Sequence, residues 1–210
     1  MFTIDDTALA GSGSAAPHAA ASSDIARFAR AAHYAARAHR FQKRKGLDGE
    51  PYVNHCLEVA ELVGLAADPG DVEVALAALL HDTVEDTSIV EDDLVRDFGR
   101  RVADLVLAVT DDKTQPDDLR KRRQVAEAPS KPRDARLIRI ADKISNLRAL
   151  VRTPPVGWTA ARLAAYVRWG RQVVDACGPT DPVLEALFAE AHAAAARVYP
   201  PVEADLRSVG

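Results

Sequence analysis

The sequence predicts an all-α protein, a single-domain helical bundle, and three observations support this prediction. Apolar residues recur at three- and four-residue intervals in several stretches, which is the spacing of amphipathic helices. No stretch shows the strict alternation of apolar and polar residues that a half-buried strand requires. Alanine is abundant and aromatic residues make up only 5% of the 210 residues, a composition that favours closely packed helices.

The first helix is expected to begin at Asp24, with Ser23 or Asp24 as its cap. A basic segment at 41–52 contains two glycines and a proline and is therefore interpreted as a loop. The segment ALAALL, within the helix at about 71–82, is apolar on nearly every side and should be buried at the centre. The helices that follow the loop are expected at about 53–67, 71–82, 91–97, 99–110, 117–127, 133–151, 158–176 and 181–198.

The two ends of the chain differ from this helical domain, which is expected to span 23–199. Residues 1–22 are rich in Ala, Ser and Gly and have no repeating apolar face, so we expect a disordered leader. Residues 200–210 are expected to form a C-terminal tail. The sequence shows neither a signal peptide nor an apolar run of the roughly 20 residues that a membrane span needs. Two distant cysteines, Cys56 and Cys177, are interpreted as reduced thiols of a cytoplasmic protein.

The net charge of −4 argues against a general binder of nucleic-acid polymers, because such proteins usually need a net basic face. A small anionic ligand is not excluded, since it requires only a local cluster of positive charge. The composition is also compatible with a homo-oligomer.

Polar residues occur where helix packing should favour apolar ones. His81 and Asp82 directly follow the apolar run, and a buried His-Asp pair is costly unless a partner compensates for it. Glu85 and Asp86 come one turn later, so helical spacing would place Glu85 over His81 and Asp86 over Asp82. Considered alone, this cluster has a simpler interpretation, in which His81 is a core histidine and Asp82 a helix cap.

Two further residues extend this cluster. Asp142 lies beside the apolar stripe of the helix at 133–151, where a carboxylate needs a partner, and Arg139 is one alternative. His55 lies early in the helix that follows the basic loop. Two imidazoles and two carboxylates on three helices can converge on one ion and leave positions open for water and substrate. This mixed nitrogen and oxygen set suits Mn²⁺, Fe²⁺ or Zn²⁺, with the ligands His55, His81, Asp82 and Asp142.

The order His, His-Asp, Asp resembles the signature of the HD superfamily of metal-dependent phosphohydrolases. Within it, the sequence is similar to the hydrolase domain of RelA/SpoT-type alarmone enzymes, especially the stand-alone small alarmone hydrolases and the metazoan SpoT homologue. The similarity spans about residues 30–175. The HD pair alone is weak evidence, whereas HDTVED with its flanking segments is specific. The matching segments are AHRFQKRK, GEPYVNH, AALLHDTVEDT, FGRRVADLVLAVTDDKT, KRRQVAEAP, IRIADKISNLR and GW…Y…W…QVV.

The resemblance implies a bundle of the HD-domain type with a metal ion, commonly Mn²⁺, on the four ligands already named. It also implies that Glu85 and Asp86 are the catalytic acidic pair and that Asn146 lies near the ribose and the scissile phosphate. The remaining matches are to nucleotide-binding residues, of which the basic ones could instead be solvated charges and the aromatic ones core packing. These residues are Arg44, Lys45, Tyr52, Lys113, Arg162 and Tyr166.

The activity that the resemblance implies is removal of 3′-pyrophosphate from alarmone nucleotides, (p)ppGpp or (p)ppApp. Two alternatives are a phosphatase for another nucleotide such as NADPH and a non-catalytic nucleotide-sensing HD module. Cys56 and Ser145 depart from the family, whose members usually have Pro and often have Tyr or His at these positions. If the residue at position 145 helps to select the base or ribose, the substrate preference could differ. Phe41 is a third departure, and His33 and His39 are interpreted as structural.

Overall fold

A computed structural model describes residues 23–68 and 71–201. The expected leader at 1–22 and most of the expected tail, 202–210, lie outside the described residues. Within the described ranges no β-sheet forms, and only two isolated bridges occur, from Lys43 to Pro51 and from Gly46 to Pro155. The prediction of an all-α fold is confirmed.

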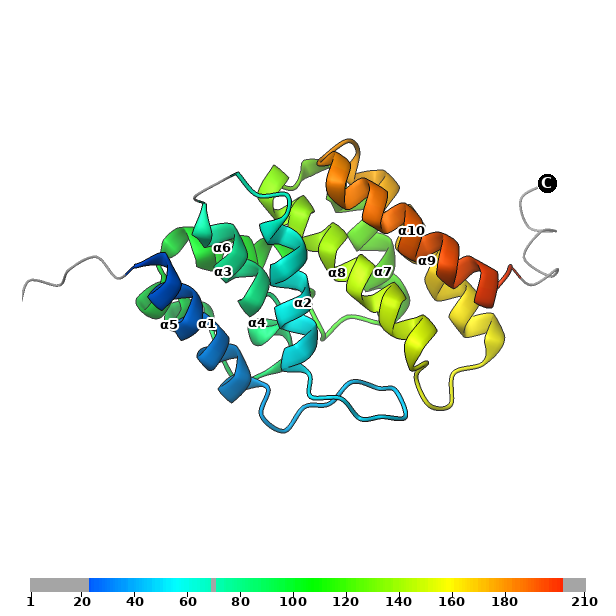
Figure 1. Ribbon diagram of the computed structural model, residues 1–210, viewed down its shortest axis with the longest axis horizontal. Helices are drawn as coiled ribbons and strands as arrows, with labels where there is room; N and C mark the ends of the chain where they lie inside the picture. Colours follow the sequence, from blue (N-terminus) through cyan, green and yellow to red (C-terminus); the bar gives the residue numbers. More distant parts are fainter. Residues whose placement is uncertain (1–22, 69–70, 202–210) are drawn as a thin grey trace, which may run out of the picture.

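The helices follow one another closely along the chain, and their positions match the predicted ones within a few residues (Figure 1). The largest difference is at the second helix, which ends at Gly64 and not near residue 67. Ser23 caps the first helix as expected, because its hydroxyl accepts a hydrogen bond of 3.2 Å from the amide of Ala26. The elements are α1 (Asp24–Ala38), α2 (Val53–Gly64), α3 (Val72–Leu80), α4 (Thr83–Asp86), α5 (Glu91–Phe98), α6 (Arg100–Val109), α7 (Asp117–Glu127), η1 (Ala128–Ser130), α8 (Arg133–Arg152), α9 (Ala160–Cys177) and α10 (Pro182–Val198).

Two helices form the centre of the bundle. The apolar helix α3 packs against α1, α2 and α6, as expected for the run ALAALL. The longer helix α8 lies between α2 on one side and α9 and α10 on the other (Figure 1). Because α2, α3 and α8 meet in this core, polar residues on their facing sides are brought together. No helix in the described part of the chain combines the length and apolar character needed to cross a bilayer.

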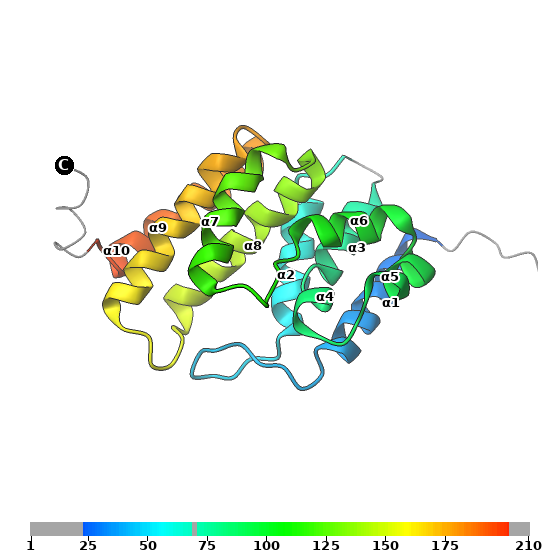
Figure 2. The ribbon, with the colours of Figure 1, turned by 180° about the vertical axis from the view of Figure 1, so that it is seen from behind.

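The chain breaks direction after α3, where a continuous helical register through residue 86 had been expected. Helix α3 ends at Leu80, and the single turn α4 starts at Thr83. The hydroxyl of Thr83 donates a 2.6 Å hydrogen bond to the carbonyl of Leu80, and such side-chain bonds compete with the helical ladder. As a result, Asp82 sits in the corner between two helices. Figure 2 shows α4, the loop at 39–52 and the segment after α6 gathered on one side of the bundle.

We expect Leu79→Ala to lower the free energy of unfolding by about 2–5 kcal/mol, because it leaves a cavity in the packed centre. Leu79 is fully buried in α3. Urea denaturation monitored by circular dichroism measures the change. The matched control is Leu65→Ala, at a position that is 59% exposed, and it should change stability by about 0.5 kcal/mol or less. Equal losses in both variants would contradict the central position of α3.

Candidate active site

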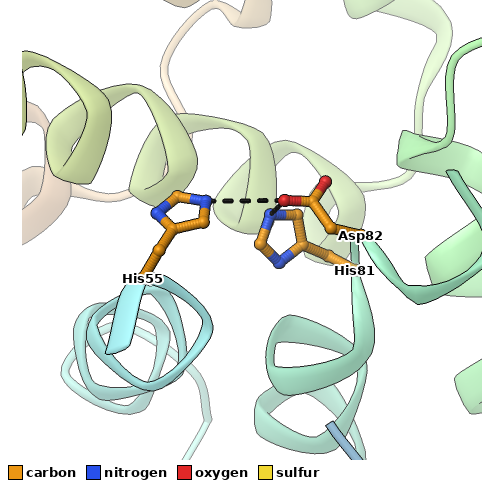
Figure 3. A group of neighbouring side chains, drawn as sticks. All are labelled: His55, His81 and Asp82. Carbon is orange, nitrogen blue, oxygen red and sulfur yellow. Dashed lines mark ion pairs between the residues drawn. The ribbon is translucent and has the colours of Figure 1, made fainter. Parts of the chain in front are cut away.

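Side chains from α2 and from the corner after α3 point toward one another in the core (Figure 3). His55, His81 and Asp82 each offer one ligand atom, and these atoms all lie within 4.8 Å of one another. The Oδ2 atom of Asp82 is 2.9 Å from Nε2 of His81 and 3.6 Å from Nε2 of His55. Both imidazoles are buried. This group has the composition and spacing of a metal site, and HD-domain hydrolases use divalent metals.

Asp142 approaches the same point from α8. Its Oδ1 atom lies 3.3 Å from Nε2 of His55 and 4.0 Å from Nε2 of His81, and the residue is only 8% exposed. Lys143 and Asn146 contact the carboxylate at 2.8 and 2.6 Å. Asp142 therefore does not depend on Arg139, the alternative partner considered from the sequence.

The orientation of the two imidazoles is set by hydrogen bonds on the side away from the carboxylates. Nδ1 of His81 lies 2.8 Å from the carbonyl of Ala78, which can only accept, so this nitrogen carries the proton. Nδ1 of His55 lies 2.8 Å from Oγ of Ser145. Both Nε2 atoms are buried and have no hydrogen-bond partner among the described residues. Two unpartnered ring nitrogens beside two carboxylates fit a divalent cation.

Both carboxylates of the group are held in the ionised form, which is the form that binds a metal ion. Burial raises the pKa of Asp82, but the charge of His81 outweighs it and holds the pKa well below its ordinary value. Burial acts in the same way on Asp142, and here Lys143 and the neighbouring imidazole of His55 reverse the effect and lower the pKa. Burial lowers the pKa of His81, yet the carboxylate of Asp82 more than compensates and raises it to about 9. Two ionised carboxylates therefore share one buried position.

Ser145 lies behind His55 and does not line the cavity next to the site. Its hydroxyl donates a 2.7 Å hydrogen bond to Glu58, so it accepts the proton of His55 Nδ1. Burial raises the pKa of Glu58, but the hydrogen bonds from Ser145 and Arg148 leave this pKa below its ordinary value. The hypothesis that the residue at 145 selects the base or ribose finds no contact in this geometry. Ser145 instead holds a metal-site imidazole in place.

The acidic pair Glu85 and Asp86 lies on α4, with a different environment for each carboxylate. Burial raises the pKa of Glu85 to about 7. The 2.9 Å hydrogen bond that Glu85 accepts from the amide of Asp111 acts in the opposite direction but is outweighed. Asp86 accepts a 2.6 Å hydrogen bond from Gln42 and pairs with Lys113. Glu85 is thus the carboxylate of the pair that exchanges a proton near neutral pH.

A cavity of about 550 Å³ opens directly above these groups. Nine Lys and Arg side chains line it against six Asp and Glu, so its wall is net positive. His55 and His81 lie beneath it and do not line it. All the other site residues expected from the sequence line this cavity: Asp82, Asp142, Glu85, Asp86, Asn146, Arg44, Lys45, Tyr52, Lys113, Arg162 and Tyr166.

The basic loop is fixed to the far side of the cavity by backbone and side-chain contacts. Arg44 donates a 3.0 Å hydrogen bond to Oδ1 of Asn146, and the carbonyl of Lys45 accepts one of 3.0 Å from the amide of Val156. A Cβ atom at Gly46 would lie 2.5 Å from the carbonyl oxygen of Thr153, so only glycine permits this approach. The loop and the segment after α8 therefore form one rim.

Tyr52 has a more specific position than the sequence indicated. Its hydroxyl donates a 2.6 Å hydrogen bond to Oδ2 of Asp82, and burial raises its pKa, so the phenol stays protonated. Tyr52 therefore supports a metal-site carboxylate as well as lining the cavity.

Two tryptophans that flank the predicted pocket residues Arg162 and Tyr166 were not expected in the site. The rings of Trp158, Tyr166 and Trp169 contact one another edge to face at 5.6 and 5.2 Å, and Arg162 lies 4.2 Å over Trp158. All four line the cavity. Arg162, Tyr166 and Trp169 recur at three- and four-residue intervals and so share one face of α9, and this spacing was the signal that could have identified Trp169. Lys121 and Lys143 also line the cavity and were not expected there.

We expect Ser145→Ala to weaken divalent-metal binding by about 10- to 100-fold, because His55 loses the hydrogen bond that orients it. Isothermal titration calorimetry with Mn²⁺ measures the dissociation constant, so the readout does not depend on catalysis. Ser145→Thr keeps a hydroxyl and should restore part of the affinity. The control is Ser130→Ala at an exposed position. Unchanged metal affinity in Ser145→Ala would refute this role.

Comparison with known proteins agrees with this geometry. The family model described as HD domain matches residues 31–167. The human and mouse proteins named guanosine-3′,5′-bis(diphosphate) 3′-pyrophosphohydrolase MESH1 are 46% and 45% identical to the chain over 163 residues. Each alignment covers 78% of this chain and 91% of the relative.

A similarity of the same kind appears among solved structures. A metazoan orthologue of SpoT that hydrolyses ppGpp superposes with a TM-score of 0.77 at 40% identity, covering 84% of this chain and 97% of that one. Because the family model matches more than half of the chain and the relatives are this similar, the chain belongs to the HD-domain family.

Proposed function

We propose that this chain is a metal-dependent hydrolase that removes the 3′-pyrophosphate from an alarmone nucleotide, ppGpp or ppApp. The observation that carries the proposal is the meeting of two imidazoles and two carboxylates beneath a cationic cavity that also contains Glu85. The names of the MESH1 relatives and the activity of the SpoT orthologue support the substrate class.

The proposed metal ligands are His55, His81, Asp82 and Asp142, with Mn²⁺ as the metal and Zn²⁺ or Fe²⁺ as alternatives. Imidazole and carboxylate ligands without thiolates suit these ions. A divalent ion at this point supplies Lewis-acid chemistry, which neutralises charge on the phosphate under attack. Tyr52 and Ser145 hold two of the ligands in position through their hydrogen bonds.

Glu85 is the proposed general base, because its pKa of about 7 lets it accept a proton from the attacking water. The water oxygen bonds to the phosphorus next to the ribose, the bond from this phosphorus to O3′ breaks, and a proton goes to O3′. Asp86 is held between Gln42 and Lys113, so its role is to position Lys113 at the cavity wall. The products are a nucleoside 5′-diphosphate with a free 3′-hydroxyl and pyrophosphate.

The substrate is proposed to lie along the cavity with its phosphates toward the basic loop. Arg44, Lys45 and Lys113 face the cavity and suit the phosphate groups, since guanidinium and ammonium groups donate to their oxygens. Asn146 bridges Arg44 and Asp142, which places it between the phosphate and metal positions. Tyr166 and Arg162, with Trp158, offer a surface against which a base can stack.

We also propose that the protein works in the cytoplasm. Cys56 and Cys177 are both free and buried, which agrees with a reducing compartment.

The substrate is tested by separating pyrophosphate from orthophosphate release over a panel of ppGpp, ppApp and NADPH with Mn²⁺ present. We expect pyrophosphate from at least one alarmone and loss of turnover with a chelator, because the site requires its metal. Faster orthophosphate release from NADPH would favour the phosphatase alternative. Nucleotide binding without turnover of any substrate would favour a sensing module.

We expect Glu85→Gln to lower kcat by about 10²–10⁴-fold, because the amide cannot accept the proton of the attacking water. Initial-rate kinetics on the best substrate measure the effect. Glu61→Gln removes the same charge at an exposed position of α2 and should keep full activity. A Glu85→Gln enzyme with undiminished kcat would contradict the assignment.

The pH dependence follows from the same carboxylate. Glu85 is protonated and inactive as a base below its pKa of about 7, so kcat/KM should fall as the pH decreases through neutrality. The positive charge of a bound metal ion would lower the pKa of Glu85, so the fall in kcat/KM would occur at a lower pH. Rates measured across neutral pH at constant ionic strength test this. A rate that rises as the pH falls would contradict it.

A further inference from the structure

A second cavity adjoins the catalytic one, and no step of the proposed reaction uses it. Its volume is about 250 Å³, and it lies between α6, α7 and the first half of α8, with Cys177 at its edge. A single water needs only about 10–15 Å³ of such space, so the cavity has room for a larger molecule. The residues that line both cavities, and so form their common wall, are Asp111, Arg120, Gln124 and Arg139.

Positive charge exceeds negative charge around this second cavity. Its acidic side chains are engaged: Glu127 pairs with Arg123 and Lys131, Asp111 lies 3.7 Å from Arg139, and Asp112 accepts from Thr114 and Gln115. The cationic residues that line it are Arg120, Arg123, Lys131, Arg136 and Arg139, against Asp111, Asp112 and Glu127.

Among the cationic residues that line this cavity, Arg136 is the one whose charge is least compensated by acidic side chains. Its guanidinium donates a 2.6 Å hydrogen bond to the backbone carbonyl of Cys177, and no ion pair to it occurs within the described residues. A partly buried guanidinium without a carboxylate partner attracts an anion.

Three residues that line this cavity carry polar atoms without a hydrogen-bond partner. Buried side-chain atoms without a hydrogen-bond partner include Nε of Arg120, Nε of Arg136 and Oε1 of Gln124, and all three residues line this cavity. The amide nitrogen of Gln124 donates to Asp111 at 2.5 Å, which fixes the amide so that its oxygen is the free atom. Buried polar groups of native proteins usually have partners, and two donors and one acceptor beside one cavity match the groups of a small polar ligand. The other such atoms in the described residues are ring nitrogens of His39, His55 and His81.

We propose that this second cavity binds a small phosphate-type oxyanion that carries a hydroxyl group, with hydrogen phosphate as the simplest example. Its oxygens accept from the Nε–H groups of Arg120 and Arg136, and its hydroxyl donates to Oε1 of Gln124. Arginine suits this role because its planar donors match the oxygens of phosphate. The site goes beyond the proposed function and does not depend on it.

An occupant would lie close to the catalytic groups. The amide of Asp111 donates to Glu85 at 2.9 Å, while the Asp111 carboxylate accepts from Gln124. Arg120 lies 3.9 Å from the other oxygen of Glu85. The anion site and the proposed general base therefore share two neighbours.

The test is calorimetric titration of the metal-depleted full chain with inorganic phosphate, pyrophosphate and glycerol phosphate in separate arms. Arg136→Gln removes a cation that lines only the second cavity, and Arg44→Gln removes one that lines only the catalytic cavity. The matched control is Arg122→Gln, which removes an exposed charge of α7 that lines neither. We expect Arg136→Gln to weaken binding by about tenfold or more, the size of a lost charged hydrogen bond. Arg122→Gln and Arg44→Gln should each retain a binding event of parental affinity.

Binding that weakens in Arg136→Gln and persists in Arg44→Gln supports the site, and the tightest anion identifies whether its source is inorganic or a phosphate ester. The proposal is overturned if the parent binds none of the three, if Arg136→Gln binds like Arg122→Gln, or if Arg44→Gln loses all binding. Thermal melting checks that each variant is folded. If Arg136→Gln is not, Arg123→Gln decides, since it removes a more exposed cation of the same cavity and should weaken binding several-fold.

Discussion

Two carboxylates and two imidazoles are buried at the meeting point of three helices, and the rest of the structure depends on how this polar group is compensated. Ionised groups in a protein interior are costly unless they are paired or bind a metal. Asp82 and Asp142 lie within 4 Å of the same two ring nitrogens, which themselves have no hydrogen-bond partner. A divalent ion bound here would give both ring nitrogens a partner and would lie against both carboxylates.

The surrounding residues hold this group in one geometry. Ala78 and Ser145 accept from the outer nitrogens of the imidazoles, while Tyr52 and Lys143 contact the two carboxylates. Each contact comes from a different part of the chain, so the bundle must be packed before the site exists. The polar pair His81 and Asp82 accordingly follows the buried apolar run of α3 and does not interrupt it. Glu85, the proposed general base, and Asp86 lie on α4, where the chain has already left the core.

Much of the fold could be predicted, because helical periodicity depends on local sequence. The break between α3 and α4 could not, since it depends on which carbonyl the Thr83 hydroxyl contacts. The predicted site residues that line the cavity came from family resemblance, and the polar residues beside apolar runs gave independent support. The position of Ser145 could not be predicted, because a shift of one residue along α8 decides whether a side chain faces the cavity or faces Glu58. Trp158 and Trp169 were overlooked because aromatic residues at helical spacing usually indicate core packing.

The central claim is that one ion is bound by side chains from α2, α8 and the corner after α3. Anomalous diffraction from crystals grown with Mn²⁺, recorded at the manganese absorption edge, tests it most directly. We predict one strong peak within coordination distance of His55, His81, Asp82 and Asp142, about 2.0–2.3 Å from each ligand atom. A peak elsewhere, or a peak that Asp142 does not reach, would contradict the account.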